Sequence, residues 1–93
     1  MTEEEWLIRN ATIANRRGLH AKAAAKFVKL AGLYNATMLV SHRGTEVSGL
    51  SIMGLMMLAA APGCTIEIKT RGPQGQEAID ALIALVEAKF DED

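Results

Sequence analysis

The clearest periodic pattern in the chain lies in residues 64–70, where apolar and polar side chains alternate. Cys64, Ile66 and Ile68 occupy one face and polar residues stand between them, as in a half-buried β-strand. Three further segments predict strands from their β-branched or aromatic content or from a flanking tight turn, and they are residues 5–13, 36–41 and 45–47.

Apolar residues at helical spacing mark three other segments. In residues 20–31 they form one stripe while lysines recur on another face, which predicts an amphipathic helix that Gly32 stops. Ser51 can cap a short helix over residues 52–58, which ends before an Ala-Pro-Gly turn. The last helix is predicted over residues 74–90.

These elements alternate in the order β-α-β-β-α-β-α. This order indicates an α+β fold with a mostly antiparallel sheet and with helices over one face. The 93 residues predict one domain, residues 1–93, because a chain of this length has no room for two independent cores.

Composition and charge are those of a soluble globular protein. The chain is 49% hydrophobic and 23% charged, with a formal net charge of −1, so it lacks the basic excess of a general polyanion binder. Cys64 is its only cysteine, which excludes an intrachain disulfide and disfavours a cysteine-based metal site. The acidic N-terminus is unlike a secretory signal, and the longest apolar run is too short to cross a bilayer. A cytoplasmic protein is therefore expected.

The stretch NRRGLHAKAAAKF contains His20 at the point where a loop changes to the predicted helix. The first backbone N–H groups of a helix have no intrahelical partner, and the helix dipole adds about half a positive charge there. Such a helix end attracts anions, including phosphoryl groups. Lys22 and Arg17 can reach the same space, and Gly18 permits a loop conformation that other residues avoid.

The same surroundings favour a neutral imidazole, because nearby cations and a helix N-terminus disfavour its protonation. A neutral ring nitrogen beside an anion site suits an attack on phosphorus. That chemistry needs a partner to bring the phosphoryl group, and it needs no metal and no cofactor. The alternative is that His20 is an ordinary solvated residue, and the local pattern by itself favours this alternative. His42 is interpreted as a hairpin-turn residue and not as a ligand.

Two segments together carry a resemblance to a known family. RRGLHAKAAAKFVKLA and, further along the chain, SIMGLMMLAAAPG resemble the histidine-containing phosphocarrier (HPr) family of the bacterial phosphotransferase system, which includes the nitrogen-branch relative NPr. The resemblance extends over nearly the whole chain. It implies an open-faced β-sandwich, in which three helices cover one face of a four-stranded antiparallel sheet.

The resemblance also implies roles for particular residues. His20 would match the histidine that enzyme I phosphorylates on Nδ1 at the expense of phosphoenolpyruvate, and it would pass the group to a IIA-type acceptor protein. Such a protein is a carrier and not a free-standing catalyst, and transient docking suggests a monomer. Ser51 would match a serine that a dedicated kinase phosphorylates in some members, or it would be a plain helix cap. Four residues match apolar positions used for docking or for the core, and they are Ile52, Met53, Leu55 and Met56.

Two residues depart from the family pattern. Lys22 stands where arginine is usual, so the charge is kept but the planar fork that suits phosphate is lost. Ala23 replaces a proline that many members carry in the first helical turn. Both departures bear on transfer rate and partner choice more than on the carrier role.

Other readings stay open on the sequence. A small RNA-binding or regulatory module would need exposed aromatic residues for base stacking, and of the aromatic residues only Trp6 lies on a predicted strand. A former carrier that binds partners without transfer is a third possibility. The carrier is favoured, with neither nucleic acid nor membrane as partner. Its branch stays open, because the ending KFDED resembles nitrogen-branch members and SIMG resembles kinase-regulated ones.

Overall fold

Four strands form one antiparallel sheet in the computed structural model, which describes residues 5–92. They are β1 (Leu7–Thr12), β2 (Thr37–His42), β3 (Thr45–Ser48) and β4 (Thr65–Arg71), in the spatial order β1-β4-β2-β3. β4 is central, since its Ile68 pairs with Arg9 of β1 and with Val40 of β2. The acidic residues Glu3, Glu4 and Asp93, at the two ends of the sequence, lie outside the described residues.

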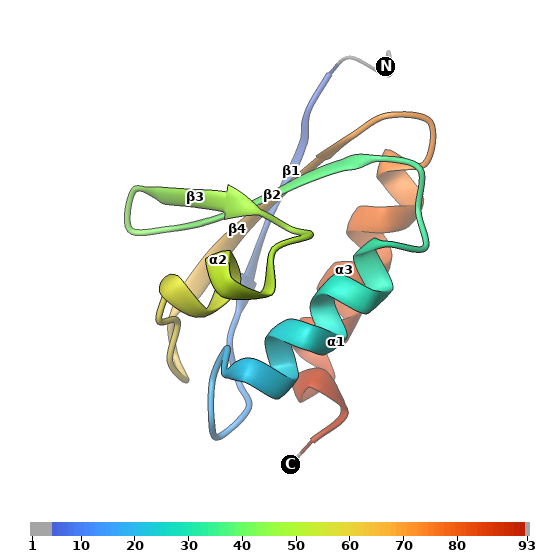
Figure 1. Cartoon of the computed structure of the whole chain (residues 1–93). Helices are drawn as coiled ribbons and strands as arrows, with labels where there is room; N and C mark the ends of the chain where they lie inside the picture. Colours follow the sequence, from blue (N-terminus) through green and yellow to red (C-terminus); the bar gives the residue numbers. More distant parts are fainter. Residues whose placement is uncertain (1–4, 93) are drawn as a thin grey trace.

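Three helices pack on one face of this sheet. They are α1 (Ala21–Ala31), α2 (Ile52–Met57) and α3 (Gly75–Glu87), and the short 3-10 turn η1 (Lys89–Asp91) follows α3. α1 and α3 lie side by side, and α2 packs against α1 and β3 (Figure 1). The predicted α+β class, element order and open-faced sandwich are confirmed. No helix within residues 5–92 is long and apolar enough to span a membrane.

The core fills the space between the sheet and the helices because each element buries the apolar side chains that recur on one of its faces. β4 contributes Ile66 and Ile68, α1 contributes Phe27, and α3 contributes Ile79 and Leu82, all without exposed surface. Each such side chain stabilises the fold by about 1.5–3 kcal/mol relative to exposure. This packing sets the position of the first turn of α1.

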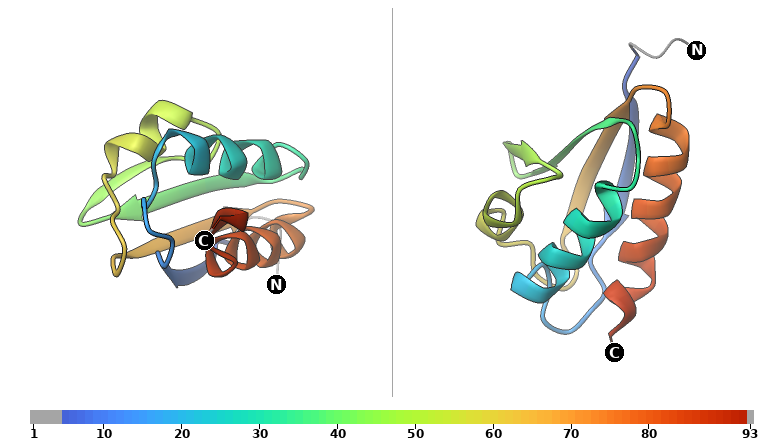
Figure 2. Two further views of the ribbon diagram at one scale, coloured as in Figure 1. Left: turned by 90° about the horizontal axis from the view of Figure 1, so that it is seen from below. Right: turned by 45° about the vertical axis from the view of Figure 1, so that its right-hand side comes forward.

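The last predicted helix is too long at its C-terminal end. α3 stops at Glu87, and Lys89, Phe90 and Asp91 have positive φ angles of 58°, 54° and 60°. Left-handed backbone costs about 1–2 kcal/mol for each residue that is not glycine. The turn directs Phe90 into the core, and it returns the end of the described chain to the loop before α1, as both views of Figure 2 show.

Candidate functional site

His20 is the residue at which α1 begins. Its backbone is extended, with φ −79° and ψ −179°, and its carbonyl oxygen accepts the first helical bond from the N–H of Ala24 at 2.8 Å. Its Nδ1 accepts a long bond of 3.3 Å from the N–H of Lys22. The Nδ1 atom therefore faces the first turn of α1, where the amides of residues 21–23 precede the helical ladder. The side chain is 18% exposed, so a partner can reach it.

The loop before α1 is held against the segment that follows α2. Gly18 has φ +65°, and a Cβ at this position would lie 2.5 Å from the carbonyl oxygen of Ala60. The N–H of Leu19 donates to the same oxygen at 2.9 Å. The predicted need for glycine at position 18 is confirmed, and the close approach of Ala60 gives it a second cause.

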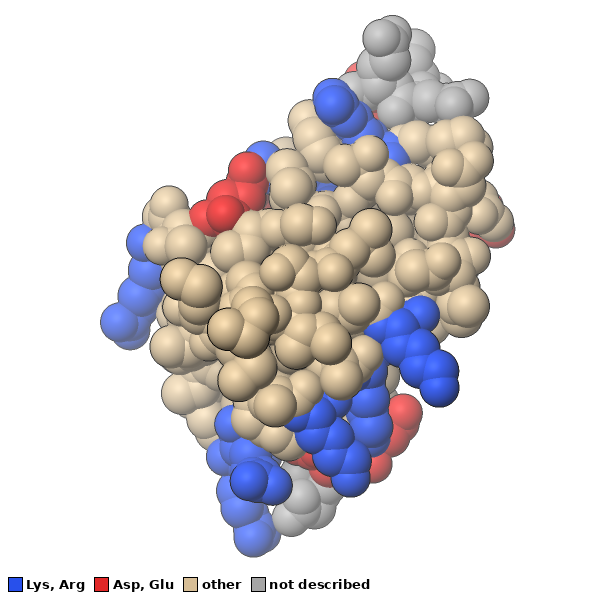
Figure 3. Space-filling model, viewed as in Figure 1, with Lys and Arg blue, Asp and Glu red and all other residues tan. Residues whose placement is uncertain are grey.

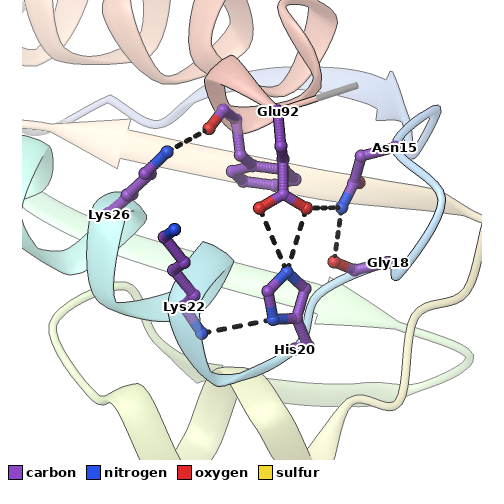
Figure 4. A network of polar contacts seen from close by, with 7 residues as sticks. Asn15, Gly18, His20, Lys22, Lys26 and Glu92 are labelled. Carbon is purple, nitrogen blue, oxygen red and sulfur yellow. Dashed lines mark hydrogen bonds and ion pairs between the residues drawn. The ribbon is translucent and has the colours of Figure 1, made fainter.

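The Nε2 atom of the imidazole contacts a carboxylate that sequence reasoning missed. It lies 2.9 Å from Oε1 and 3.3 Å from Oε2 of Glu92 (Figure 4). The hydrogen bond from His20, followed by one from Asn15, lowers the pKa of Glu92, so its side chain is ionised at neutral pH. The expected surroundings of the ring, namely cations and the helix end, are therefore incomplete, because Glu92 brings a negative charge to Nε2.

Asn15 connects Glu92 to the loop before α1. It is fully buried, and its Nδ2 donates to the carbonyl oxygen of Gly18 at 2.8 Å and to Oε1 of Glu92 at 2.9 Å. The opposite amide orientation would set its oxygen against two acceptors, so these contacts decide the orientation. Sequence analysis found neither residue, because 77 positions separate Asn15 from Glu92 and no local pattern links them.

Two contacts hold the chain end that carries Glu92. Phe90 is fully buried, and its carbonyl oxygen accepts a bond of 2.7 Å from Nζ of Lys26. Lys26 follows Lys22 by four positions, so both lie on the same face of α1. The helix that begins at His20 therefore also anchors residues 88–92, called the tail below, through Lys26.

The charged groups of the two predicted cations, unlike the carboxylate of Glu92, make no hydrogen bond to the His20 ring within the described residues. Both Lys22 and Arg17 are exposed. Within residues 5–92, the Lys22 ammonium has no ion-pair partner and Arg17 makes no hydrogen bond or ion pair with His20. The ammonium of Lys22 is thus available to an incoming anion beside Nδ1.

Ser51 caps α2, as the sequence predicts. Its Oγ accepts the N–H of Gly54 at 2.9 Å, and its carbonyl oxygen accepts the N–H of Leu55 at 3.0 Å. The residue is half-buried. Its hydroxyl therefore satisfies one of the free amides at the start of α2.

Comparison with known proteins decides the family. The family model described as PTS HPr component phosphorylation site matches residues 8–88. The chain belongs to the HPr family. Its relatives include the phosphocarrier protein HPr of Cupriavidus necator, 49% identical over 92% of this chain and 97% of the relative. The phosphocarrier protein NPr of Shewanella violacea is 42% identical over 92% of this chain and 94% of its own.

The fold of the HPr family recurs in solved structures. The crystal structure of HPr-C-His from Thermoanaerobacter tengcongensis matches with a TM-score of 0.89 at 36% identity, over 94% of this chain and 98% of the other. HPr from Bacillus anthracis matches with a TM-score of 0.85 at 35% identity, over 89% of this chain and 99% of the other.

The apolar residues that the HPr resemblance singled out do not all reach the surface. Ile52, Met53 and Met56 are exposed, but Leu55 is fully buried. Of the two roles that the resemblance left open for Leu55, only the core role fits, because it lies on the side of α2 that faces the core and so does not contribute to a docking surface. Two neighbours of these residues, Leu50 and Met57, are exposed as well. The exposed set, called the α2 patch below, consists of Leu50, Ile52, Met53, Met56 and Met57. Figure 3 shows a broad uncharged face over α2, bordered below by lysine and arginine side chains.

Aromatic residues of this HPr-family chain do not form a stacking surface within residues 5–92. Phe27 and Phe90 are fully buried. The ring of Trp6 is covered by Lys69 and Arg71, whose charged groups lie 5.3 Å and 4.4 Å from its centroid. The RNA-binding alternative requires several accessible rings, and the structure offers no such set in this range.

The second histidine lies away from His20 in this HPr-family chain. His42 is the last residue of β2, beside the turn to β3, and its Nδ1 lies 3.2 Å from the carbonyl oxygen of Thr65. Across residues 5–92, no three side chains of the types that ligate metals are grouped to hold an ion.

Proposed function

We propose that this HPr-family phosphocarrier accepts a phosphoryl group on Nδ1 of His20 from phosphorylated enzyme I and passes it to a IIA-type protein. The group comes ultimately from phosphoenolpyruvate. The proposal depends on one observation, the position of Nδ1 at the first turn of α1, where it accepts the N–H of Lys22. A nitrogen that accepts a hydrogen bond carries a lone pair, and a lone pair at an anion-binding helix end is suited to attack phosphorus.

The transfer forms an Nδ1–P bond and breaks the bond between phosphorus and its donor atom on enzyme I. The electron pair of the broken bond stays with the donor atom, and His20 releases no proton because Nδ1 attacks through its lone pair. The phosphoryl oxygens then lie beside the amides of residues 21–23 and the positive end of the helix dipole. The N–H of Lys22, which donates to Nδ1 before transfer, becomes free to donate to a phosphoryl oxygen.

Lys22 supplies the cation for this site. Its ammonium attracts the phosphoryl oxygens as a point charge, whereas arginine would bind two of them through its planar fork. Arg17 adds positive charge from the loop. A Lys22→Arg variant is therefore expected to transfer faster than the wild type.

The α2 patch is the proposed docking surface for both enzyme I and the acceptor. The segment after α2 contacts the loop before His20 through Ala60, Gly18 and Leu19, so a partner seated on the patch lies next to the histidine. Phosphorylation of Ser51 by a dedicated kinase would add about −1.5 to −2 charges at the start of α2. That charge would repel an acidic partner surface.

Incubation with enzyme I and labelled phosphoenolpyruvate tests the proposal. Stoichiometric label is expected that is labile in acid, stable in base and absent from His20→Ala, whereas the matched control His42→Ala keeps it. Label that survives in His20→Ala would move the acceptor elsewhere, and wild-type protein without label would favour a regulatory protein that transfers nothing.

Two further measurements assign the branch of the phosphotransferase system, sugar uptake or nitrogen-linked regulation, and the assembly state. The phosphorylated protein is offered separately to IIA proteins of sugar uptake and of nitrogen-linked regulation, and the faster transfer identifies the branch. We expect the protein to act in the cytoplasm as a monomer of 10.0 kDa, and sedimentation of the free protein measures that mass.

A further inference from the structure

The two nitrogens of His20 face different surroundings, as Figure 4 shows. Nδ1 lies 3.3 Å from the backbone nitrogen of Lys22, and Nε2 lies 2.9 Å from Oε1 of Glu92. Glu92 is therefore on the side of the ring away from the proposed phosphoryl site. Its contact with the proposed site is made through the imidazole.

Both contacts select the same tautomer of the neutral ring. An ionised carboxylate only accepts hydrogen bonds, so Nε2 must carry the proton that joins it to Glu92. A backbone N–H only donates, so Nδ1 must present its lone pair to Lys22. The Nε2–H tautomer is also the one whose Nδ1 can attack phosphorus.

We propose that Glu92 is a positioning residue that holds His20 in the Nε2–H tautomer and stabilises the positive ring formed during transfer. This inference rests on the proposed function of His20. When the Nδ1 lone pair becomes a bond to phosphorus while Nε2 keeps its proton, the imidazole ring gains a positive charge. A carboxylate 2.9 Å from Nε2 stabilises that charge through a charge-assisted hydrogen bond.

The tail that carries Glu92 is held in place by several independent contacts. Asn15 donates to the same Oε1 atom that Nε2 contacts, Lys26 binds the carbonyl oxygen of Phe90, and the Phe90 ring is fully buried. Three consecutive residues adopt positive φ angles to make this return possible. Left-handed backbone outside glycine persists only where its surroundings hold it, so the carboxylate is fixed beside the ring.

Nitrogen-15 NMR of the His20 ring tests the tautomer without any partner protein. The wild type is expected to show a protonated Nε2 and an unprotonated Nδ1. Glu92→Ala removes the acceptor and is expected to give a mixture of the two tautomers. Glu92→Gln keeps an acceptor oxygen and should keep most of the preference. Asp91→Asn is the matched control, because it removes one negative charge from the neighbouring residue without touching His20.

The initial rate of phosphorylation by enzyme I tests whether Glu92 stabilises the positive charge that the His20 ring gains during transfer. Glu92→Ala is expected to slow it by about tenfold, which corresponds to about 1.4 kcal/mol and lies near the lower end for a hydrogen bond to a charged group. Glu92→Gln should fall between Glu92→Ala and the wild type, and Asp91→Asn should match the wild type.

A Glu92→Ala protein with the wild-type tautomer and rate would overturn the inference. A changed tautomer with an unchanged rate would overturn the role in transfer, and a slowed Asp91→Asn would assign the effect to general charge. If Glu92→Ala unfolds, Glu92→Gln decides the question by the same two measurements. These outcomes differ from failure of the proposed function, in which the wild-type protein takes no label on His20.

Discussion

The carbonyl oxygen of Ala60 lies 2.5 Å from the point that a Cβ on Gly18 would occupy. Gly18 also has φ +65°, so Gly18→Ala combines a backbone clash with a left-handed alanine. The left-handed conformation alone costs about 1–2 kcal/mol, and the clash adds to it. We expect urea unfolding to show a loss of about 2 kcal/mol or more.

Gly44→Ala is the matched control for Gly18→Ala. Gly44 has φ +83°, but nothing lies within 4 Å of the added Cβ. Only the conformational cost of about 1–2 kcal/mol applies there. Equal losses in the two variants would contradict the importance of the contact with Ala60.

Lys26→Met tests the anchor of the C-terminal tail. The change removes the 2.7 Å bond to the carbonyl oxygen of Phe90 while keeping an apolar stem on α1. We expect a loss of about 1 kcal/mol in unfolding free energy and faster amide exchange in residues 89–92. Lys29→Met removes the same charge from an exposed lysine of α1, and it should leave tail exchange unchanged.

Glu92 is expected to make stability depend on pH in one direction. Its pKa is lowered by the hydrogen bond from His20 and then by that from Asn15. The resulting stabilisation is present above the ordinary value of 4.5 and is lost as the pH falls through the lower value of the folded state. The difference in unfolding free energy between wild type and Glu92→Gln should therefore be present at pH values above 4.5 and shrink as the pH falls below that value. A difference that grows as the pH falls below 4.5 would contradict this assignment.

Ser51→Ala removes the cap of α2. The Gly54 N–H loses the 2.9 Å bond to Oγ, and the expected cost is about 1 kcal/mol, measured by urea unfolding. Ser51→Asp can accept the same bond and should restore most of the loss. The same Ser51→Asp protein should be phosphorylated more slowly by enzyme I if charge at this cap repels the partner.

Met53→Glu tests the α2 patch as a docking surface. Met53 is 69% exposed and Leu33, just after α1 and outside the patch, is 72% exposed, so Leu33→Glu makes a matched change elsewhere. Met53→Glu is expected to raise the KM for enzyme I by about tenfold, since burying a charge at an apolar contact is costly. Equal KM values in the two variants would place docking on another surface.

Much of the fold could be predicted from local patterns. The alternation around Ile66 and Ile68 predicted β4, and the apolar stripe through Phe27 predicted α1, because each pattern repeats within a few residues. Sequence reasoning erred at the end of α3. Helical periodicity continues to Phe90, but the burial of that ring against distant elements favours a left-handed turn after Glu87.

The residues of the candidate site likewise differ in whether a local sequence pattern reveals them. His20, Lys22 and Ser51 could be found because helix starts have local signatures that short-range hydrogen bonds impose. The choice between docking and core stayed open for Leu55, because the sequence of a short helix does not say which of its apolar residues face the core.

The sequence by itself determined that a histidine stands at the start of a helix whose first amides can receive an anion. Only the tertiary structure decided which nitrogen of that histidine faces the amides. The orientation of the ring depends on Glu92, which lies 72 residues further along the chain. No local rule relates residues so far apart, and their contact exists only because the packed core returns the end of the chain to the first turn of α1.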